Sequence, residues 1–244
     1  MQNAIGVFDS GLGGLSVLNS AVDLLPNEQF IYVADSLHAP FGNKSDEFIL
    51  NRCQVICKFL IKKNVKCILL ACNTATLACV DTLRVQYNVP IVAIEPGLKP
   101  AVLNSLTQKI LMLATQSTLK SANYQNLRHA HAHHCEIFEQ ACNGWVELVE
   151  SGNTLIEKNN PNINIIQQYL NDIHEKGIDQ IVLGCTHYPF LKPLIVECLV
   201  LAKIEKSISI VDTSTAVANH LKTVLRTHHL LKPESNNAVK NVTL

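Results

Sequence analysis

Two cysteines, Cys72 and Cys185, each follow a short apolar run and are themselves followed closely by threonine. The runs are Ile68-Leu69-Leu70-Ala71 and Ile181-Val182-Leu183-Gly184. A buried strand that ends this way places its thiol at the carboxyl edge of a sheet, where open α/β sheets bind ligands. Two such thiols could work on opposite faces of one carbon, one removing a proton and the other returning one. A single cysteine at a strand end is more often an inert core residue, but the repeated pattern favours a catalytic pair.

A glycine-rich turn, Gly11-Leu12-Gly13-Gly14, follows the first strand-like segment. It has neither the full GxGxxG spacing nor the GK[ST] of a P-loop, so it does not indicate a nucleotide site. Backbone N–H groups at a helix N-terminus suit a small anion instead. We expect Asn73, Thr74 and Thr186 at equivalent helix starts, where they would offer donors to an amino acid with two carboxylates. Helix N-termini after both cysteines would also favour the thiolate form.

Residues that bind metals or cofactors are present but poorly arranged for that purpose. Four histidines lie between His129 and His134, yet their alternating spacing fits no common metal geometry, and we expect a solvated loop there. Lys44, Lys99 and Lys120 could each form a Schiff base, but none has a context that indicates a pyridoxal cofactor. We therefore predict a site with no metal and no cofactor.

Strand and helix signals alternate along the chain, which predicts parallel sheets covered by helices. The expected strands are 4–9, 30–35, a run ending at Cys72, 91–94, 109–114, 135–141, 180–183 and 208–212. The expected helices run to Leu25 and over 45–63, 75–86, 115–127 (with its preceding turn), 162–175, 193–202 and 214–225. We predict two similar α/β domains, 1–96 plus 208–244 and 97–207, with the last strand and helix returning to the first.

Composition narrows the class of protein. The formal net charge is zero, with 20 basic and 20 acidic side chains, whereas nucleic-acid binding normally shows as a basic excess. Apolar residues make up 48% of the chain, which predicts a sizeable core, and no run approaches the roughly 20 apolar residues that span a bilayer. The nine cysteines include no CxxC pair and suit a reducing compartment. We expect a soluble, cytoplasmic protein that binds neither nucleic acid nor membrane.

Six segments occur in an informative order: Asp9–Val17 (DSGLGGLSV), Pro40-Phe41-Gly42, Ala71–Ala75 (ACNTA), Glu95-Pro96, Val149-Glu150 and Gly184–Pro189 (GCTHYP). Together they resemble glutamate racemase, and the resemblance runs from about residue 5 to residue 220. The wider aspartate/glutamate racemase superfamily shares the paired cysteines. The opening FDSGLGG and the GCTHYP segment are similar to the glutamate branch in particular.

The resemblance implies a fold and an activity. The fold would be two pseudo-symmetric α/β domains, each a mostly parallel sheet flanked by helices, with the substrate in the cleft between them. The activity would be the cofactor-independent interconversion of L- and D-glutamate, which supplies D-glutamate for bacterial peptidoglycan and so serves cell-wall biogenesis and cell shape. Cys72 and Cys185 would be the acid/base catalysts. Asp9 would assist the Cys72 side, and Glu150 and His187 the Cys185 side.

The resemblance also implies the residues that hold the carboxylates and ammonium of the substrate: Asp9, Ser10, Phe41, Gly42, Asn73, Thr74, Thr115, Thr118, Thr186 and His187. Two positions depart from the family pattern. Phe41 stands where tyrosine is usual, and because a backbone contact is expected there, we retain it. Glu147 stands where proline is common, which leaves open which glutamate faces the cleft; our choice is Glu150.

Two other functions remain open from the sequence. One is a different enzyme of the same superfamily, such as an aspartate or hydantoin racemase. The other is a protein that only binds an amino acid or regulates a partner protein, although binding a dicarboxylate needs no basic sulfur. The sequence also allows a homodimer.

Overall fold

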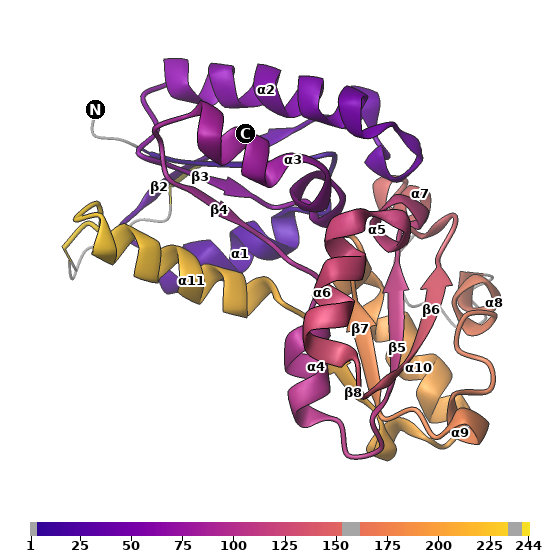
Figure 1. Cartoon of the computed structure of the whole chain (residues 1–244). Coiled ribbons are helices and arrows are strands. Elements are labelled where there is room, and N and C mark those ends of the chain that lie inside the picture. The colour runs from indigo at the N-terminus through magenta and orange to yellow at the C-terminus, as the bar shows by residue number, and fades with distance from the viewer. Residues whose placement is uncertain (1–3, 153–161, 234–240) are drawn as a thin grey trace. The chain divides into compact units, whose positions relative to one another are not determined.

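The computed structural model describes residues 4–152, 162–233 and 241–244. The chain divides into two compact units, Met1–Glu95 with Thr213–Leu244, and Pro96–Asp212 (Figure 1). Each unit is built on one sheet in which every strand pair is parallel. The predicted α/β class, with a helix-flanked parallel sheet in each half, is confirmed.

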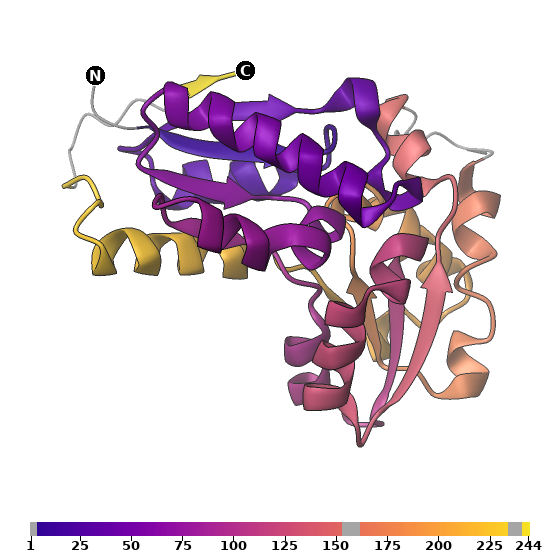
Figure 2. The same ribbon diagram turned by 45° about the horizontal axis from the view of Figure 1, so that its top comes forward.

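The sheet of the first unit has the order β4-β3-β1-β2-β9. Its strands are β1 (Ile5–Asp9), β2 (Gln29–Ala34), β3 (Cys67–Leu70), β4 (Ile91–Ala93) and β9 (Asn241–Thr243). The helices are α1 (Leu15–Leu24), α2 (Asp46–Lys62), α3 (Asn73–Gln86) and α11 (Ser214–Thr227), with the short 3-10 helices η1 (Ser36–His38) and η2 (Phe41–Asn43). α2 and α3 cover one face of the sheet, and α1 and α11 cover the other (Figure 2). Each face therefore has its own hydrophobic core.

The sheet of the second unit has the order β6-β5-β7-β8. Its strands are β5 (Lys109–Ala114), β6 (Glu136–Ala141), β7 (Gln180–Leu183) and β8 (Ser209–Val211). The helices are α4 (Leu98–Asn104), α5 (Gln116–Lys120), α6 (Ala122–Ala132), α7 (Trp145–Glu150), α8 (Asn162–Gln167), α9 (Ile173–Lys176) and α10 (Lys192–Leu201), with η3 (Tyr188–Leu191) and η4 (Glu205–Ser207). Trp145 is fully buried in its core and makes edge-on contacts with Tyr169 and Tyr188, at centroid distances of 5.5 and 4.9 Å.

The last crossing between the units differs from the prediction. The strand expected over 208–212 was assigned to the first domain, but β8 pairs with β7, with Gln180 opposite Ser209 and Val182 opposite Val211. This pairing covers an edge of β7 that would otherwise leave backbone groups without partners. The chain consequently returns to the first unit at Thr213, and only α11 and the C-terminal segment belong there.

Three smaller predictions also change. The helix expected over 162–175 is interrupted between α8 and α9, where Asp172 adopts a positive φ of 62°. The last strand expected from the sequence is 208–212, but Asn241–Thr243 forms a further strand, β9, beside β2. His129 and His131 lie on the last turn of α6 and not in a loop, and His133 and His134 follow directly.

Neither a membrane-spanning helix nor a metal-binding cluster is found among residues 4–152, 162–233 and 241–244. No helix in these ranges is long and apolar enough to cross a membrane. No group of three or more histidine, cysteine, aspartate or glutamate side chains within them is arranged to hold a metal ion.

Candidate active site

The carboxylate at the end of β1 is fixed by the turn that follows it. Asp9 is completely buried, and its Oδ2 accepts a hydrogen bond from the Gly14 N–H at 2.7 Å. The Tyr32 hydroxyl donates to the Gly11 carbonyl at 2.6 Å and braces the same turn. A Cβ added at Gly14 would lie 2.6 Å from Asp9 Cβ and 2.8 Å from Tyr32 Oη. Glycine is therefore required for the backbone to approach the carboxylate so closely.

The first candidate thiol caps a long helix. Cys72 lies two residues after β3 and is only 4% exposed. It is the N-cap of α3, and its sulfur accepts a hydrogen bond from the Ala75 N–H at 3.4 Å. The thiol lies 3.8 Å from Ser10 Oγ. A helix N-terminus stabilises negative charge, so this position favours a thiolate.

Two neighbours of Cys72 have features that suit a ligand. The Asn73 side chain is 2% exposed, and neither its Oδ1 nor its Nδ2 has a hydrogen-bond partner among the described residues. Because buried amides are normally satisfied, this one is available to a ligand. The Phe41 ring is buried in the core with Ile49 and Cys53. The ring is thus committed to packing, and the Phe41 carbonyl accepts from the Lys44 N–H at 3.0 Å, so the backbone groups that suit a ligand are the N–H groups of Phe41 and Gly42.

The second candidate thiol has different neighbours. Cys185 lies two residues after β7, and its sulfur is 3.7 Å from Nδ1 of the buried His187. The other ring nitrogen, Nε2, is 2.6 Å from Oε1 of Glu150 at the end of α7. Thiol, imidazole and carboxylate therefore form a continuous chain along which a proton can move. Glu147 is exposed, so Glu150 is the glutamate that the structure brings to this group.

The helix start expected at Thr186 is absent, and this prediction is wrong. Tyr188 N–H bonds the Cys185 carbonyl and Phe190 N–H bonds the His187 carbonyl, which is the i to i−3 pattern of a 3-10 helix. Pro189, between them, has no N–H to donate. α10 begins only at Lys192, so no α-helix N-terminus follows this cysteine directly.

Thr115 and Thr118 lie at the carboxyl end of β5, the strand beside β7. Thr115 is the N-cap of α5, and its Oγ1 accepts from the Thr118 N–H at 3.2 Å. The two hydroxyl oxygens are 3.0 Å apart, and both side chains are buried. The hydroxyls are thus held near the edge from which Cys185 emerges.

The structure places every predicted site residue in one of two groups, each near the carboxyl edge of one sheet. The first group is Asp9, Ser10, Phe41, Gly42, Cys72, Asn73 and Thr74, and the second is Thr115, Thr118, Glu150, Cys185, Thr186 and His187. The sequence analysis missed Tyr32, because a tyrosine within a strand looks like any core aromatic. Only its hydroxyl, bonded to a turn 21 residues away, shows its role.

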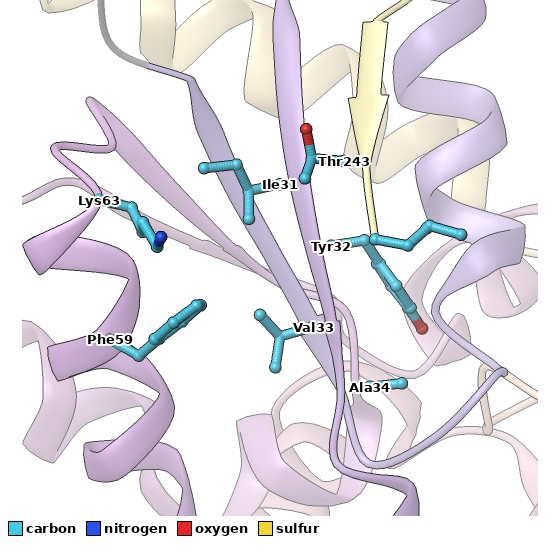
Figure 3. A pocket seen from close by; sticks show the side chains of 8 residues that line it. Ile31, Tyr32, Val33, Ala34, Phe59, Lys63 and Thr243 are labelled. Atoms are coloured by element: carbon cyan, nitrogen blue, oxygen red, sulfur yellow. The ribbon is translucent and has the colours of Figure 1, made fainter.

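A pocket of about 480 Å³ in the first unit is lined in part by Tyr32 but by none of the site residues predicted from the sequence. Ile31 and Val33 of β2 point into it toward Phe59 of α2 and Lys63, which directly follows α2, whereas Tyr32 points to the other side of the sheet (Figure 3). Thr243 and Leu244 complete its wall. It is a separate, mainly apolar feature of the side of the sheet covered by α2.

Several other cysteines are held as thiols. Burial raises the pKa of Cys57 and of Cys67 to about 12, and that of Cys198 to about 11. All nine cysteines are free. Thiols with such high pKa values stay protonated at neutral pH and act as small apolar side chains.

Comparison with known proteins gives consistent matches. The family described as Asp/Glu/Hydantoin racemase matches residues 13–221. A protein named glutamate racemase from Methylococcus capsulatus is 43% identical over 230 residues, 94% of this chain and 82% of the relative. One of the same name from Pseudomonas aeruginosa is 43% identical over 93% of this chain and 83% of its own length.

Two solved structures are similar over nearly the whole chain. Glutamate racemase from Francisella tularensis in complex with D-glutamate has a TM-score of 0.80 and 29% identity, covering 98% of this chain and 87% of its own. The Escherichia coli glutamate racemase, in complex with L-glutamate and the activator UDP-MurNAc-ala, has a TM-score of 0.79 and 30% identity, covering 97% and 85%.

Proposed function

The chain belongs to the Asp/Glu/Hydantoin racemase family, and from this premise we propose that it interconverts L- and D-glutamate by means of two cysteines. The relatives at 43% identity carry the name glutamate racemase, which supports glutamate as the substrate. The observation that carries the proposal is the pair of thiols, Cys72 and Cys185, each at the carboxyl edge of its own sheet.

In the proposed reaction, one cysteine is a thiolate and the other a thiol. The thiolate takes the α-hydrogen of glutamate as a proton and leaves a carbanion. The thiol then gives its proton to the opposite face of that carbon, which inverts the stereocentre. The reverse reaction uses the same groups with their roles exchanged. Both thiols must reach one α-carbon, so the mechanism requires the two units to close on the substrate and exclude water.

The carbanion needs stabilisation arranged in advance, because the α-hydrogen of an amino acid is very weakly acidic. We assign the carboxylates and ammonium of the substrate to the side chains of Ser10, Asn73, Thr74, Thr115, Thr118 and Thr186 and to the backbone of Phe41 and Gly42. The unsatisfied buried amide of Asn73 supports this assignment. The mechanism uses no metal and no cofactor.

Each thiol has its own assistant in this mechanism. For Cys72, the Ala75 N–H and the start of α3 stabilise the thiolate, while the buried Asp9 orients or shuttles a proton. An anionic Asp9 would oppose the thiolate, so a proton-handling role is the one consistent with its position. For Cys185, His187 exchanges a proton with the sulfur, and Glu150 holds the imidazole in place.

The cellular part of the proposal is the supply of D-glutamate for bacterial peptidoglycan in the cytoplasm. Nine free cysteines suit a reducing compartment. The similar Escherichia coli glutamate racemase structure is a complex with the activator UDP-MurNAc-ala.

The test is to incubate the protein with L-glutamate and D-glutamate separately and to follow circular dichroism. We expect both solutions to converge on zero ellipticity. L- and D-aspartate and a 5-substituted hydantoin serve as the competing substrates. Racemisation of one of these in place of glutamate would contradict the assignment of glutamate as the substrate. Binding of glutamate without exchange of its α-hydrogen in deuterated water would contradict the proposal that the protein is an enzyme.

A further inference from the structure

A buried carboxylate at the carboxyl end of β2 joins three elements of the first unit. Asp35 is 7% exposed, and Arg52 of α2 donates from Nε to Oδ2 at 2.8 Å and from Nη2 to Oδ1 at 3.0 Å. His38, on η1, lies with its Nδ1 2.8 Å from Oδ1. The backbone N–H of Asp35 donates to the carbonyl of Asp9 at 3.1 Å. Asp35 is therefore tied directly to the strand end that carries the proposed catalytic carboxylate.

The surroundings of Asp35 hold it in the ionised form. Burial raises the pKa of its carboxyl group, but hydrogen bonds from Arg52 and His38 outweigh that effect, and the net result is a lowered pKa. A two-pronged Arg–carboxylate pair also fixes direction as well as distance. Both carboxylate oxygens are already occupied by these partners, so Asp35 is not arranged to act on a substrate itself.

The segment that this network holds is the loop between β2 and α2. It contains η1 and η2, and with them Phe41 and Gly42, whose backbone we assign to the substrate. The loop is anchored at one point by the buried Phe41 ring and at another by His38 on Asp35. η2 packs against α3, the helix that Cys72 caps. A shift of His38 would therefore disturb the backbone that we assign to substrate binding.

We propose that Asp35, His38 and Arg52 are positioning residues that set the place of the Phe41–Gly42 backbone and thereby the affinity for substrate. The inference rests on the proposed function, because it assigns the loop to substrate capture. The three side chains contact neither Cys72 nor Cys185. We therefore expect them to stabilise the bound substrate and the transition state equally. Loss of such binding raises KM and leaves kcat nearly unchanged.

A matched control lies at the other end of the same strand. Glu28 directly precedes β2, and Lys66 directly precedes β3. These two side chains form an ion pair with an N–O distance of 2.6 Å, and at 1% and 5% exposed they are more buried than Asp35 and Arg52. Lys66 also donates to the carbonyl of Leu230. This pair fastens the amino edge of the sheet and the segment after α11, far along β2 from the loop. It supports the fold without positioning the loop.

The experiment compares D35N with E28Q by thermal melting and by steady-state kinetics from both glutamate enantiomers. D35N should raise KM about tenfold or more in both directions, the effect of losing charge-assisted hydrogen bonds, with kcat changed by less than about threefold. E28Q should lower the melting temperature at least as much but leave KM within about twofold. Within the network, H38L should raise KM, and H38N, which keeps a donor near the place of Nδ1, should largely restore it.

The inference is overturned if D35N leaves KM unchanged, if it lowers kcat alone, or if E28Q raises KM as much as D35N does. If D35N fails to fold, the H38L and H38N pair decides, and equal KM values for these two variants would contradict the inference. Wild-type protein that does not racemise glutamate would remove the proposed function together with this inference. If the wild-type protein racemises glutamate but D35N has the wild-type KM, only this inference is removed and the proposed function stands.

Discussion

The two thiol-bearing edges of this molecule occupy the same place in two parallel sheets, yet their neighbours differ. Cys72 caps the 14-residue helix α3 and accepts a hydrogen bond from a backbone N–H. The buried carboxylate of Asp9 lies at the end of β1, the strand that pairs with β3. Cys185 is followed by a four-residue 3-10 helix and faces an imidazole that is bonded to a carboxylate. The start of an α-helix therefore lies at one thiol, and an imidazole lies beside the other.

The difference shows that a repeated architecture supplies position but not chemistry. A helix N-terminus stabilises a thiolate without changing its own charge, and it acts only within its first turn. No α-helix begins directly after β7, and in the proposed mechanism His187 exchanges a proton with the thiol instead. The two proton transfers should therefore depend on different residues, which variants can separate.

The largest effect is expected from the thiols themselves. C72S and C185S should each lower racemisation by about 10³-fold or more, because a general acid/base typically contributes about 10² to 10⁴ and a serine hydroxyl is far less acidic. The measurement is circular dichroism from each enantiomer. C135S, at a partly exposed cysteine, is the control and should stay active. Full activity in either of the first two variants would contradict the paired role.

Replacing Asp9 or His187 should lower the rate less than replacing a thiol does, and the two variants should differ in which enantiomer is more affected. D9N and H187N should each slow the reaction by about 10²-fold, the lower end of an acid/base contribution. Because the equilibrium constant of a racemisation is one, kcat/KM must stay equal in the two directions. The asymmetry should instead appear in the α-deuterium isotope effect, which should rise for one enantiomer in D9N and for the other in H187N.

H133N, at an exposed histidine, is the control for H187N and should leave both isotope effects unchanged. A rise for the same enantiomer in D9N and H187N would show that the two edges do not divide the work between them.

Two glycines, one at each edge, test how tightly the backbone packs there. In G14A the new Cβ meets Asp9 Cβ at 2.6 Å, and in G184A it meets the Leu113 carbonyl at 2.9 Å. Each substitution should cost about 1–3 kcal/mol of unfolding free energy in urea titrations, as overpacking commonly does. G14A should share the isotope pattern of D9N, and G184A that of variants on the Cys185 side. Wild-type stability and activity in both would contradict the tight packing described here.

A further effect concerns the structural thiols Cys57 and Cys67 at alkaline pH. The pKa values of Cys57 and Cys67, raised by burial to about 12, exceed those of the unfolded chain. Their contribution to stability is complete below about pH 8.5 and is lost as the pH rises toward the folded values, by up to about 1.4 kcal/mol per pH unit for each thiol. Urea unfolding between pH 7.5 and 10 should show this decline, and C67A should make it shallower. An unchanged slope in C67A would contradict the assigned burial effect.

Much of this structure follows from local patterns. Apolar runs predicted the strand that ends at Asp9 and the two strands that precede Cys72 and Cys185, because burial and period act within a few residues. The strand near 210 was misassigned because its partner, β7, lies about 30 residues earlier and local patterning does not choose between two open sheet edges. The 3-10 turn after Cys185 depended on how Pro189 altered the hydrogen bonding of its neighbours. The Asp35 network depends on a residue 17 positions away on another element, and spacing gives no sign of it.

The most direct test of the two-thiol mechanism is racemisation of each protiated enantiomer in deuterated water, with NMR of the α-position during the first few per cent of reaction. If one thiol removes the hydrogen and a different one supplies its replacement, the newly formed enantiomer should carry solvent deuterium from the outset, whichever enantiomer was supplied. Product that retains the original hydrogen of the substrate would mean that a single group serves both faces, and would contradict the account.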